Sequence, residues 1–288
     1  MPTAQQKYRG PDAEGRNAVI ALAAYGSRVQ QCLARALDDA SPTFYAQPRP
    51  GAPVDPALSA VDLLCLVVGD DPAAIEQARA QLQALRAADR LSLVLAPRDV
   101  QPRLAPWADA LGGWPDGAGE EDLVAARRQR RAASSLTGWI AGLERLLRDQ
   151  GLVCVDFADV RCIIHRAGPA ALAIGLGHGR RRLDDALAQL RASLSAQGVD
   201  RHAYSRAILS IRGSAELSVG DFDYIAGALR ELLPTVGTQC LGLRVDEGSE
   251  GVELGLLLAG QVQGEPDHDT SRRQGSYRVP KILKESQC

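Results

Sequence analysis

The chain has 288 residues, 45% of them hydrophobic, and a formal net charge of −2, so it can bury the core of one large or two smaller domains. The near-neutral charge argues against bulk nucleic-acid binding, which favours a strongly basic face. No apolar run approaches the roughly 20 residues that span a bilayer, and residues 1–16 form a polar tail without an apolar signal core, which predicts a cytoplasmic protein with no direct membrane insertion.

The first half of the chain alternates short apolar runs with helical patterns. In chain order, we expect strand, helix, strand, helix and strand at residues 17–25, 29–37, 61–68, 73–88 and 91–96. Uninterrupted apolar strands that alternate with helices are typical of a parallel sheet covered on both faces. Residues 102–120 are rich in Gly, Pro and Trp and are expected to be irregular.

A long central helix is expected next, at residues 127–150, with an apolar stripe along one side and Gly151 at its end. It opens with a run of arginines at residues 127–131, which either meets an anionic ligand or forms a solvated basic face.

The second half is expected to be an α+β domain that covers residues 151–261. Helices are predicted at 156–165, 183–195 and 221–233, and strands at 170–176 and 207–212, followed by a hairpin of 240–245 with 252–259. Residues 262–288 are expected to be a flexible linker that ends in a short apolar-basic peptide.

Cysteine and histidine usage gives no sign of a metal site or of a disulfide framework. None of the four histidines lies at metal-ligand spacing from a cysteine or another histidine. In a cytosolic chain the six cysteines are interpreted as buried or free thiols, at Cys32, Cys65, Cys154, Cys162, Cys240 and Cys288.

Residues 151–161 carry the most specific motif, GLVCVDFADVR. It closely resembles the loop and helix start that follow the central helix of FtsZ, where the pattern is Gly-Leu-x-Asn-Val-Asp-Phe-Ala-Asp-Val. The resemblance continues through 170–178, 208–223 and 240–259, whereas residues 17–126 match only in the order of their elements. It implies an α/β fold of the tubulin/FtsZ type, with a shortened Rossmann-like N-terminal domain (17–126), the central helix and the α+β domain.

The resemblance assigns a catalytic role to Asp156 and Asp159, acting on the nucleotide of a neighbouring subunit. In FtsZ the matching carboxylates orient and polarise the water that attacks the γ-phosphate, as acceptors of its proton or hydrogen bond. The alternative is that Asp156 is only an N-cap and Asp159 only a capping-box acid. The family's Asn falls on Cys154, which counts against efficient catalysis but keeps Cys154 as an interaction residue.

Measured against the same family, the nucleotide pocket is largely lost. The glycine-threonine phosphate loop falls on residues 68–72, where Gly69 is followed by two aspartates and a proline. The first phosphate loop keeps Gly26, and the guanine-reading pair falls on Ala133 and Ser134. We therefore expect no cofactor of its own, residual contacts at most from Gly26 and Gly69, and the GTP of a neighbouring FtsZ subunit as the nucleotide it meets. The glycines at 175–179 are interpreted as a structural turn.

Near the C-terminus, Val279, Pro280, Ile282 and Leu283 resemble the terminal peptide of FtsZ, which binds membrane tethers and regulators of the division ring. The resemblance implies a division-ring adaptor as partner; the alternative is a chance match of six residues.

Three functions follow from these observations. The leading hypothesis is a degenerate paralogue, without GTP hydrolysis of its own, that binds head-to-tail to FtsZ or to itself at the division site and modulates or caps filaments. The second is a divergent, self-assembling GTPase of the FtsZ family. The third is a scaffold that uses the fold only to bind another partner.

Overall fold

The structure is a computed structural model, and it describes residues 10–11, 17–27, 29–31, 45–46, 54–113, 155–200, 203–214, 216–245 and 251–260. The predicted central helix at 127–150, Cys154 and the C-terminal peptide lie outside these residues. In the described part, no helix is long and apolar enough to cross a membrane.

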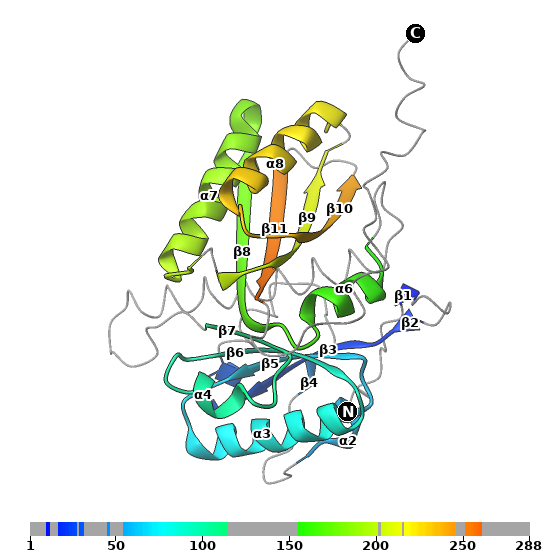
Figure 1. The fold of residues 1–288 in the computed structure, drawn as a ribbon, viewed down its shortest axis with the longest axis vertical. Helices are drawn as coiled ribbons and strands as arrows, with labels where there is room; N and C mark the ends of the chain where they lie inside the picture. The colour runs from blue at the N-terminus through cyan, green and yellow to red at the C-terminus, as the bar shows by residue number, and fades with distance from the viewer. Residues whose placement is uncertain are drawn as a thin grey trace.

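The first half of the chain forms a parallel sheet with strand order β7-β6-β5-β3-β4 (Figure 1). The three predicted strands are found, as β3, β5 and β6, and every residue in them is buried. Strands that are buried along their whole length need cover on both faces, as the sequence predicted. The strands are Ile20–Tyr25 (β3), Tyr45–Ala46 (β4), Leu63–Val68 (β5), Leu91–Ala96 (β6) and Ala110–Gly113 (β7). Beside them, Gly10–Pro11 (β1) pairs antiparallel with Asn17–Ala18 (β2).

Helices cover the two faces of this parallel sheet. On one face lies Pro72–Ala87 (α3), whose buried Ile75, Leu82 and Leu85 pack on the odd-numbered residues of β3 and the even-numbered residues of β5. The other face receives Phe157–Ile164 (α6), which lies between the two halves of the molecule (Figure 1). Two short helices, Pro56–Ser59 (α2) and Gln101–Leu104 (α4), complete the first half.

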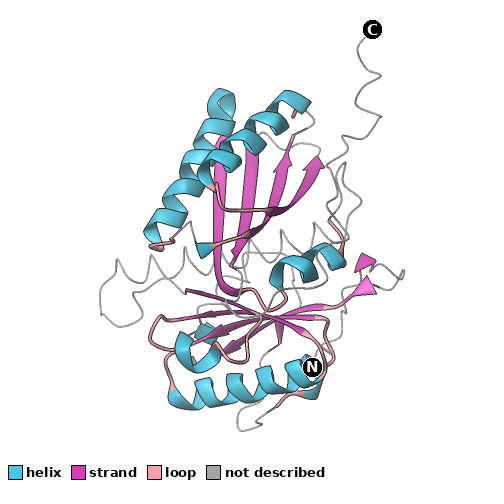
Figure 2. Cartoon of the chain, viewed as in Figure 1, coloured by secondary structure: helices cyan, strands magenta, loops and turns pink. Residues whose placement is uncertain are grey.

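The second half is a mixed sheet with two helices on one face (Figure 2). Its strand order is β8-β11-β9-β10, and the apolar cluster between sheet and helices includes Leu190, Leu229 and Leu256. The strands are Gly168–His178 (β8), Arg206–Gly213 (β9), Thr238–Val245 (β10) and Gly251–Ala259 (β11); the helices are Gly179–Arg181 (η1, a 3-10 turn), Arg182–Ala196 (α7) and Val219–Leu232 (α8). The α/β architecture expected from the sequence is confirmed.

The predicted hairpin of residues 240–245 with 252–259 is wrong. β11 lies between β8 and β9 and pairs antiparallel with both, whereas β10 pairs parallel with β9 alone. Burial explains the outcome, because β11 is apolar and mostly buried, as a central strand must be, while β10 is half-exposed, as suits an edge.

The segment predicted to be irregular, 102–120, contributes a strand. β7 has only four residues, two of them glycine, so no apolar run marks it in the sequence. It pairs parallel with β6 on one side and with the start of β8 on the other, through Ala110↔Gly168 and Gly112↔Ala170. One hydrogen-bonded sheet of nine strands therefore runs through both halves of the described chain.

The sequence predicted a structural turn at the glycines of 175–179. This prediction is wrong except at Gly179, the last of them. Gly175 and Gly177 lie within β8, where a Cβ atom would stand 2.0 Å from the carbonyl oxygen of Ala186 and 1.7 Å from that of Arg182. Only glycine lets the backbone of α7 approach the strand so closely. Gly179 alone turns the chain, with φ +67°.

Candidate functional site

Asp156 and Asp159 come together at the N-terminus of α6 in a reciprocal capping box. The Asp156 carboxylate accepts the backbone N–H of Asp159 at 2.8 Å, and the Asp159 carboxylate accepts that of Asp156 at 3.1 Å. Each bond uses one carboxylate oxygen, and a carboxylate has about four acceptor sites. The capping that the sequence offered as an alternative is therefore present. It leaves acceptor capacity on the exposed Asp156, whereas Asp159 is half-buried.

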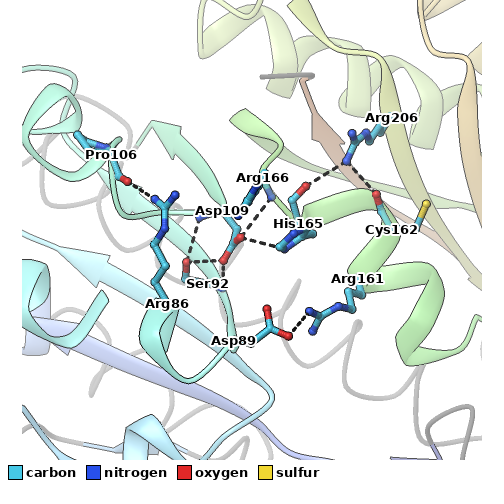
Figure 3. A network of polar contacts seen from close by, with 10 residues as sticks. All are labelled: Arg86, Asp89, Ser92, Pro106, Asp109, Arg161, Cys162, His165, Arg166 and Arg206. Carbon is cyan, nitrogen blue, oxygen red and sulfur yellow. Dashed lines mark hydrogen bonds and ion pairs between the residues drawn. The ribbon is translucent and has the colours of Figure 1, made fainter. Parts of the chain in front are cut away.

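The rest of α6 is fixed by its apolar face and by its last carbonyls. Val160, Ile163 and Ile164 are fully buried in the cluster that joins α6 to the sheet. At the other end, the Arg206 guanidinium donates to the carbonyl oxygens of Cys162 at 2.9 Å and His165 at 3.2 Å (Figure 3). A cation suits the negative end of a helix. The acidic pair is thus presented on a rigid element.

Asp109, at the start of β7, holds the turn after α6 against the parallel sheet (Figure 3). Its carboxylate accepts the backbone N–H and the hydroxyl of Ser92, both at 3.0 Å, and the N–H of Arg166 at 3.2 Å. The imidazole of His165 lies 3.4 Å from the same carboxylate. A second polar contact connects α6 to the first half of the chain: Arg161 forms an ion pair with Asp89 at 2.7 Å. These contacts lock α6 to the first half of the chain.

Cys240, on the edge strand β10 of the second half, lies near the acidic pair Asp156 and Asp159. Burial, and after it the charges of Asp159, Cys162 and Asp156, raise the pKa of its thiol to about 12. The Cys240 side chain packs on the cluster that contains the buried face of α6. The start of β10 and the N-terminus of α6 are therefore neighbours, and the thiol is protonated at neutral pH.

The structure also brings Gly26 and Gly69 side by side, at the carboxyl ends of β3 and β5. The N–H of Gly69 donates to the Tyr25 carbonyl at 2.9 Å, and a Cβ on Gly26, where φ is +105°, would lie 3.5 Å from the Cα of Gly69. This is the edge of a parallel sheet where open α/β folds bind ligands. Here, however, a Cβ on Gly69 would meet the Val29 side chain at 3.3 Å, and one on Gly26 would meet Ala74 at 3.6 Å. Apolar side chains therefore lie beside both glycines.

The helix N-terminus next to these glycines already carries an anion. Asp71 caps α3, accepting the N–H of Ala73 at 3.0 Å, and Pro72 occupies the first helical position without an N–H to donate. Asp70 beside it is exposed. A phosphate at this terminus would have to displace one carboxylate and approach another, which is electrostatically unfavourable.

Several predicted site residues cannot be placed, because they lie outside the described residues. They are Cys154, the arginines at 127–131, Ala133, Ser134 and the peptide residues Val279, Pro280, Ile282 and Leu283. Within the described residues, no group of three or more His, Cys, Asp or Glu side chains lies where it could hold a metal ion.

The sequence did not point to Asp109, Ser92, Val29 or Ala74. Asp109 lies in the segment interpreted as irregular, and its partners are 17 and 57 positions away. Val29 and Ala74 were recognised only as helix residues, and their place against the glycines depends on the packing of both helices.

Comparison with known proteins gives similarity in sequence and in fold. No family model matches the chain. It is 28% identical over 132 residues to the cell division protein FtsZ of Coxiella burnetii, which is 46% of this chain and 34% of that protein. It is 27% identical over 147 residues to FtsZ 1 of Methanocaldococcus jannaschii, or 50% of this chain and 40% of that protein. The aligned part thus spans less than half of these curated relatives.

The fold matches over most of the chain. An empty FtsZ dimer from M. jannaschii superposes with a TM-score of 0.67 at 17% identity, covering 86% of this chain and 89% of that one. CetZ2 from Haloferax volcanii, in a GTPγS-bound protofilament, gives a TM-score of 0.57 at 15% identity, covering 84% and 92%.

Proposed function

Since this chain has the tubulin/FtsZ fold and is similar to FtsZ in sequence, we propose that it docks on FtsZ filaments through α6 and modulates or caps them, without hydrolysing GTP itself. The observation that carries the proposal is an asymmetry between two surfaces. The acidic pair Asp156 and Asp159 is presented on a fixed helix, while the glycine edge is bordered by Val29, Ala74 and the Asp71 cap.

Head-to-tail contacts extend a filament only when each subunit offers both complementary faces. A subunit that offers its acidic face but no nucleotide face joins one filament end and receives no further subunit. The Asp156 carboxylate retains acceptor capacity beyond the capping box, so it can orient water at a nucleotide held by the subunit it docks on.

A second candidate is a divergent GTPase, favoured by the adjacency of Gly26 and Gly69 at the ligand-binding edge of a parallel sheet. It requires Val29 and Asp71 to move out of the way. Nucleotide measured in the purified full-length protein separates the candidates: bound GTP or GDP near one equivalent supports the GTPase, and none supports the docking protein.

The test of the docking proposal is a titration of this protein into assembling FtsZ from the same source, with GTP turnover and pelletable polymer recorded together. We expect a change in both at substoichiometric amounts. No change at an equimolar ratio would overturn the proposal.

The acidic pair is tested with variants that separate charge from capping. Asp156→Asn keeps a good N-cap and removes the charge, so it should abolish the effect on FtsZ with little loss of stability. The matched control is Asp221→Ala, because Asp221 and Ser218 form the same capping box on α8, away from α6. If Asp156→Asn acts on FtsZ as the wild type does, the carboxylate has no role there.

A further inference from the structure

β10 is one of the two end strands of the described nine-stranded sheet. β10 lies at the end of the strand order, and no described residue pairs with it on its outer side. Its eight residues pair with β9 in one uninterrupted register, so it contains no bulge. It also has no Pro and no Lys, and Arg244 is its one charged residue. Natural edge strands usually carry such features to prevent pairing, and their absence makes β10 a template for another strand.

The two faces of β10 differ in chemistry. Leu241 and Leu243 pack with the cluster under α7 and α8. Because side chains alternate along a strand, Cys240, Gly242 and Arg244 lie on the opposite face, where Cys240 packs on the α6 cluster. One end of this face is acidic, since Asp156 and Asp159 are near Cys240. The other end carries Arg244, whose register neighbour on β9, Arg212, forms an ion pair with Glu253 at 3.8 Å.

We propose that β10 pairs antiparallel with β10 of a second copy of this chain, about a two-fold axis through Gly242, to give a continuous sheet across a symmetric dimer. In this register Leu241 lies opposite Leu243 of the second copy, and Cys240 lies opposite Arg244 of the second copy. Residues directly opposite in an antiparallel pair share a face, so the apolar pair meets beside α8 and the guanidinium meets the acidic end beside α6.

The complementarity is reciprocal, as a two-fold interface requires. Each copy contributes one acidic end and one basic end, and each basic end lies over the acidic end of the other. A shift by one residue would move Arg244 to oppose Gln239 or Leu241, and would break the leucine pairs. The inference does not depend on the proposed function, since it concerns a lateral contact and not a head-to-tail one.

The first test is sedimentation of the full-length protein over a range of concentrations. Dimers are expected in the wild type, and Leu241→Lys should weaken dimerisation at least about tenfold, because it places an ammonium opposite an apolar side chain. Leu176→Lys is the matched control, since Leu176 is 46% exposed on β8, which β9 and β11 separate from β10. This variant should dimerise as the wild type does. A wild type that stays monomeric up to about 100 µM, or a Leu241→Lys variant that dimerises normally, overturns the proposal.

The register is tested by a disulfide across the axis. Directly opposed residues have Cα atoms about 4.5–5.5 Å apart, which suits a disulfide. With oxidised glutathione as oxidant, Gly242→Cys should give a covalent dimer that the wild type, with its native cysteines, does not form. Gly237→Cys, just before the strand, should not form this covalent dimer.

Hydrogen exchange gives a separate test of the free edge. If the amides of residues 238–245 are protected from exchange in a monomer, another segment of the same chain covers the edge, which also overturns the proposal.

Discussion

Replacing Asp109 by alanine should destabilise the protein more than any other single loss of a polar side chain described above. The Asp109 carboxylate is the acceptor for two groups of Ser92, a residue that is 1% exposed. In the Asp109→Ala variant the Ser92 N–H and hydroxyl lose this acceptor in a place that water does not reach. Each unsatisfied buried group costs about 1–3 kcal/mol, so the expected loss for the two groups is about 2–6 kcal/mol.

That loss is a large share of the total stability of an ordinary domain, which is about 5–15 kcal/mol. The contact with Arg166 adds less, because its N–H bond lies at the surface. Asp109→Asn should cost about half as much, since its remaining oxygen still serves Ser92. Urea unfolding followed by circular dichroism gives the midpoints and slopes for wild type, Asp109→Asn and Asp109→Ala, in that order of decreasing stability.

Glu76→Ala is the matched control, because Glu76 forms ion pairs with Arg79 and Arg103 in which every side chain is 47–49% exposed. Exposed pairs contribute about 0–1 kcal/mol. If Asp109→Ala lies within about 0.5 kcal/mol of this control, the buried acceptor does not have the role that its geometry indicates.

Three further changes should have measurable effects. Asp156→Ala should destabilise the protein by about 1 kcal/mol in urea unfolding, through loss of the α6 cap, and Asp156→Asn by only a few tenths; equal losses would contradict capping as the cause. Gly175→Ala should lower the melting temperature sharply, because its Cβ would stand 2.0 Å from a carbonyl of α7, whereas Gly227→Ala, with nothing within 4 Å of its Cβ, should raise stability by about 0.5–1 kcal/mol. Iodoacetamide at pH 8 should label exposed Cys162 well before Cys240, because a pKa of about 12 keeps the Cys240 thiol protonated. Labelling of Cys240 should become faster as the pH rises toward that value. Equal labelling rates of the two cysteines at pH 8, measured by mass spectrometry, would refute this.

Local patterns in the sequence were enough to predict most elements. β6 was predicted at its observed bounds, and α3 and α7 within one residue, because long apolar runs and helical periodicity are set by burial on one or both faces. The capping box of α6 was also foreseen as one alternative, since its two acids are three residues apart. Elements whose signal is local were therefore predictable from single segments.

Partners far apart in the chain were not predictable in the same way. Turn-forming residues between 245 and 252 suggested a hairpin, yet strand pairing followed burial, and β11 took the central position. β7 was missed because its glycines give no apolar signal, and Asp109 was missed with it. The glycines of β8 resembled a turn because nothing in the sequence shows that the carbonyl of Arg182 lies over Gly177.

The position of β11 has a consequence for synthesis on the ribosome. β8 and β9 do not pair with each other; each pairs with β11, which is the last strand of the described chain to be made. While β11 is still untranslated, β8 stays separated from the β9–β10 pair in the nascent second half, and the apolar faces of α7 and α8 have no complete sheet to cover. The first half can fold as it emerges, because its strands pair with neighbours made shortly before or after them. The second half must wait, so chaperones that bind exposed apolar segments should engage nascent chains in the interval between α7 and the completion of β11.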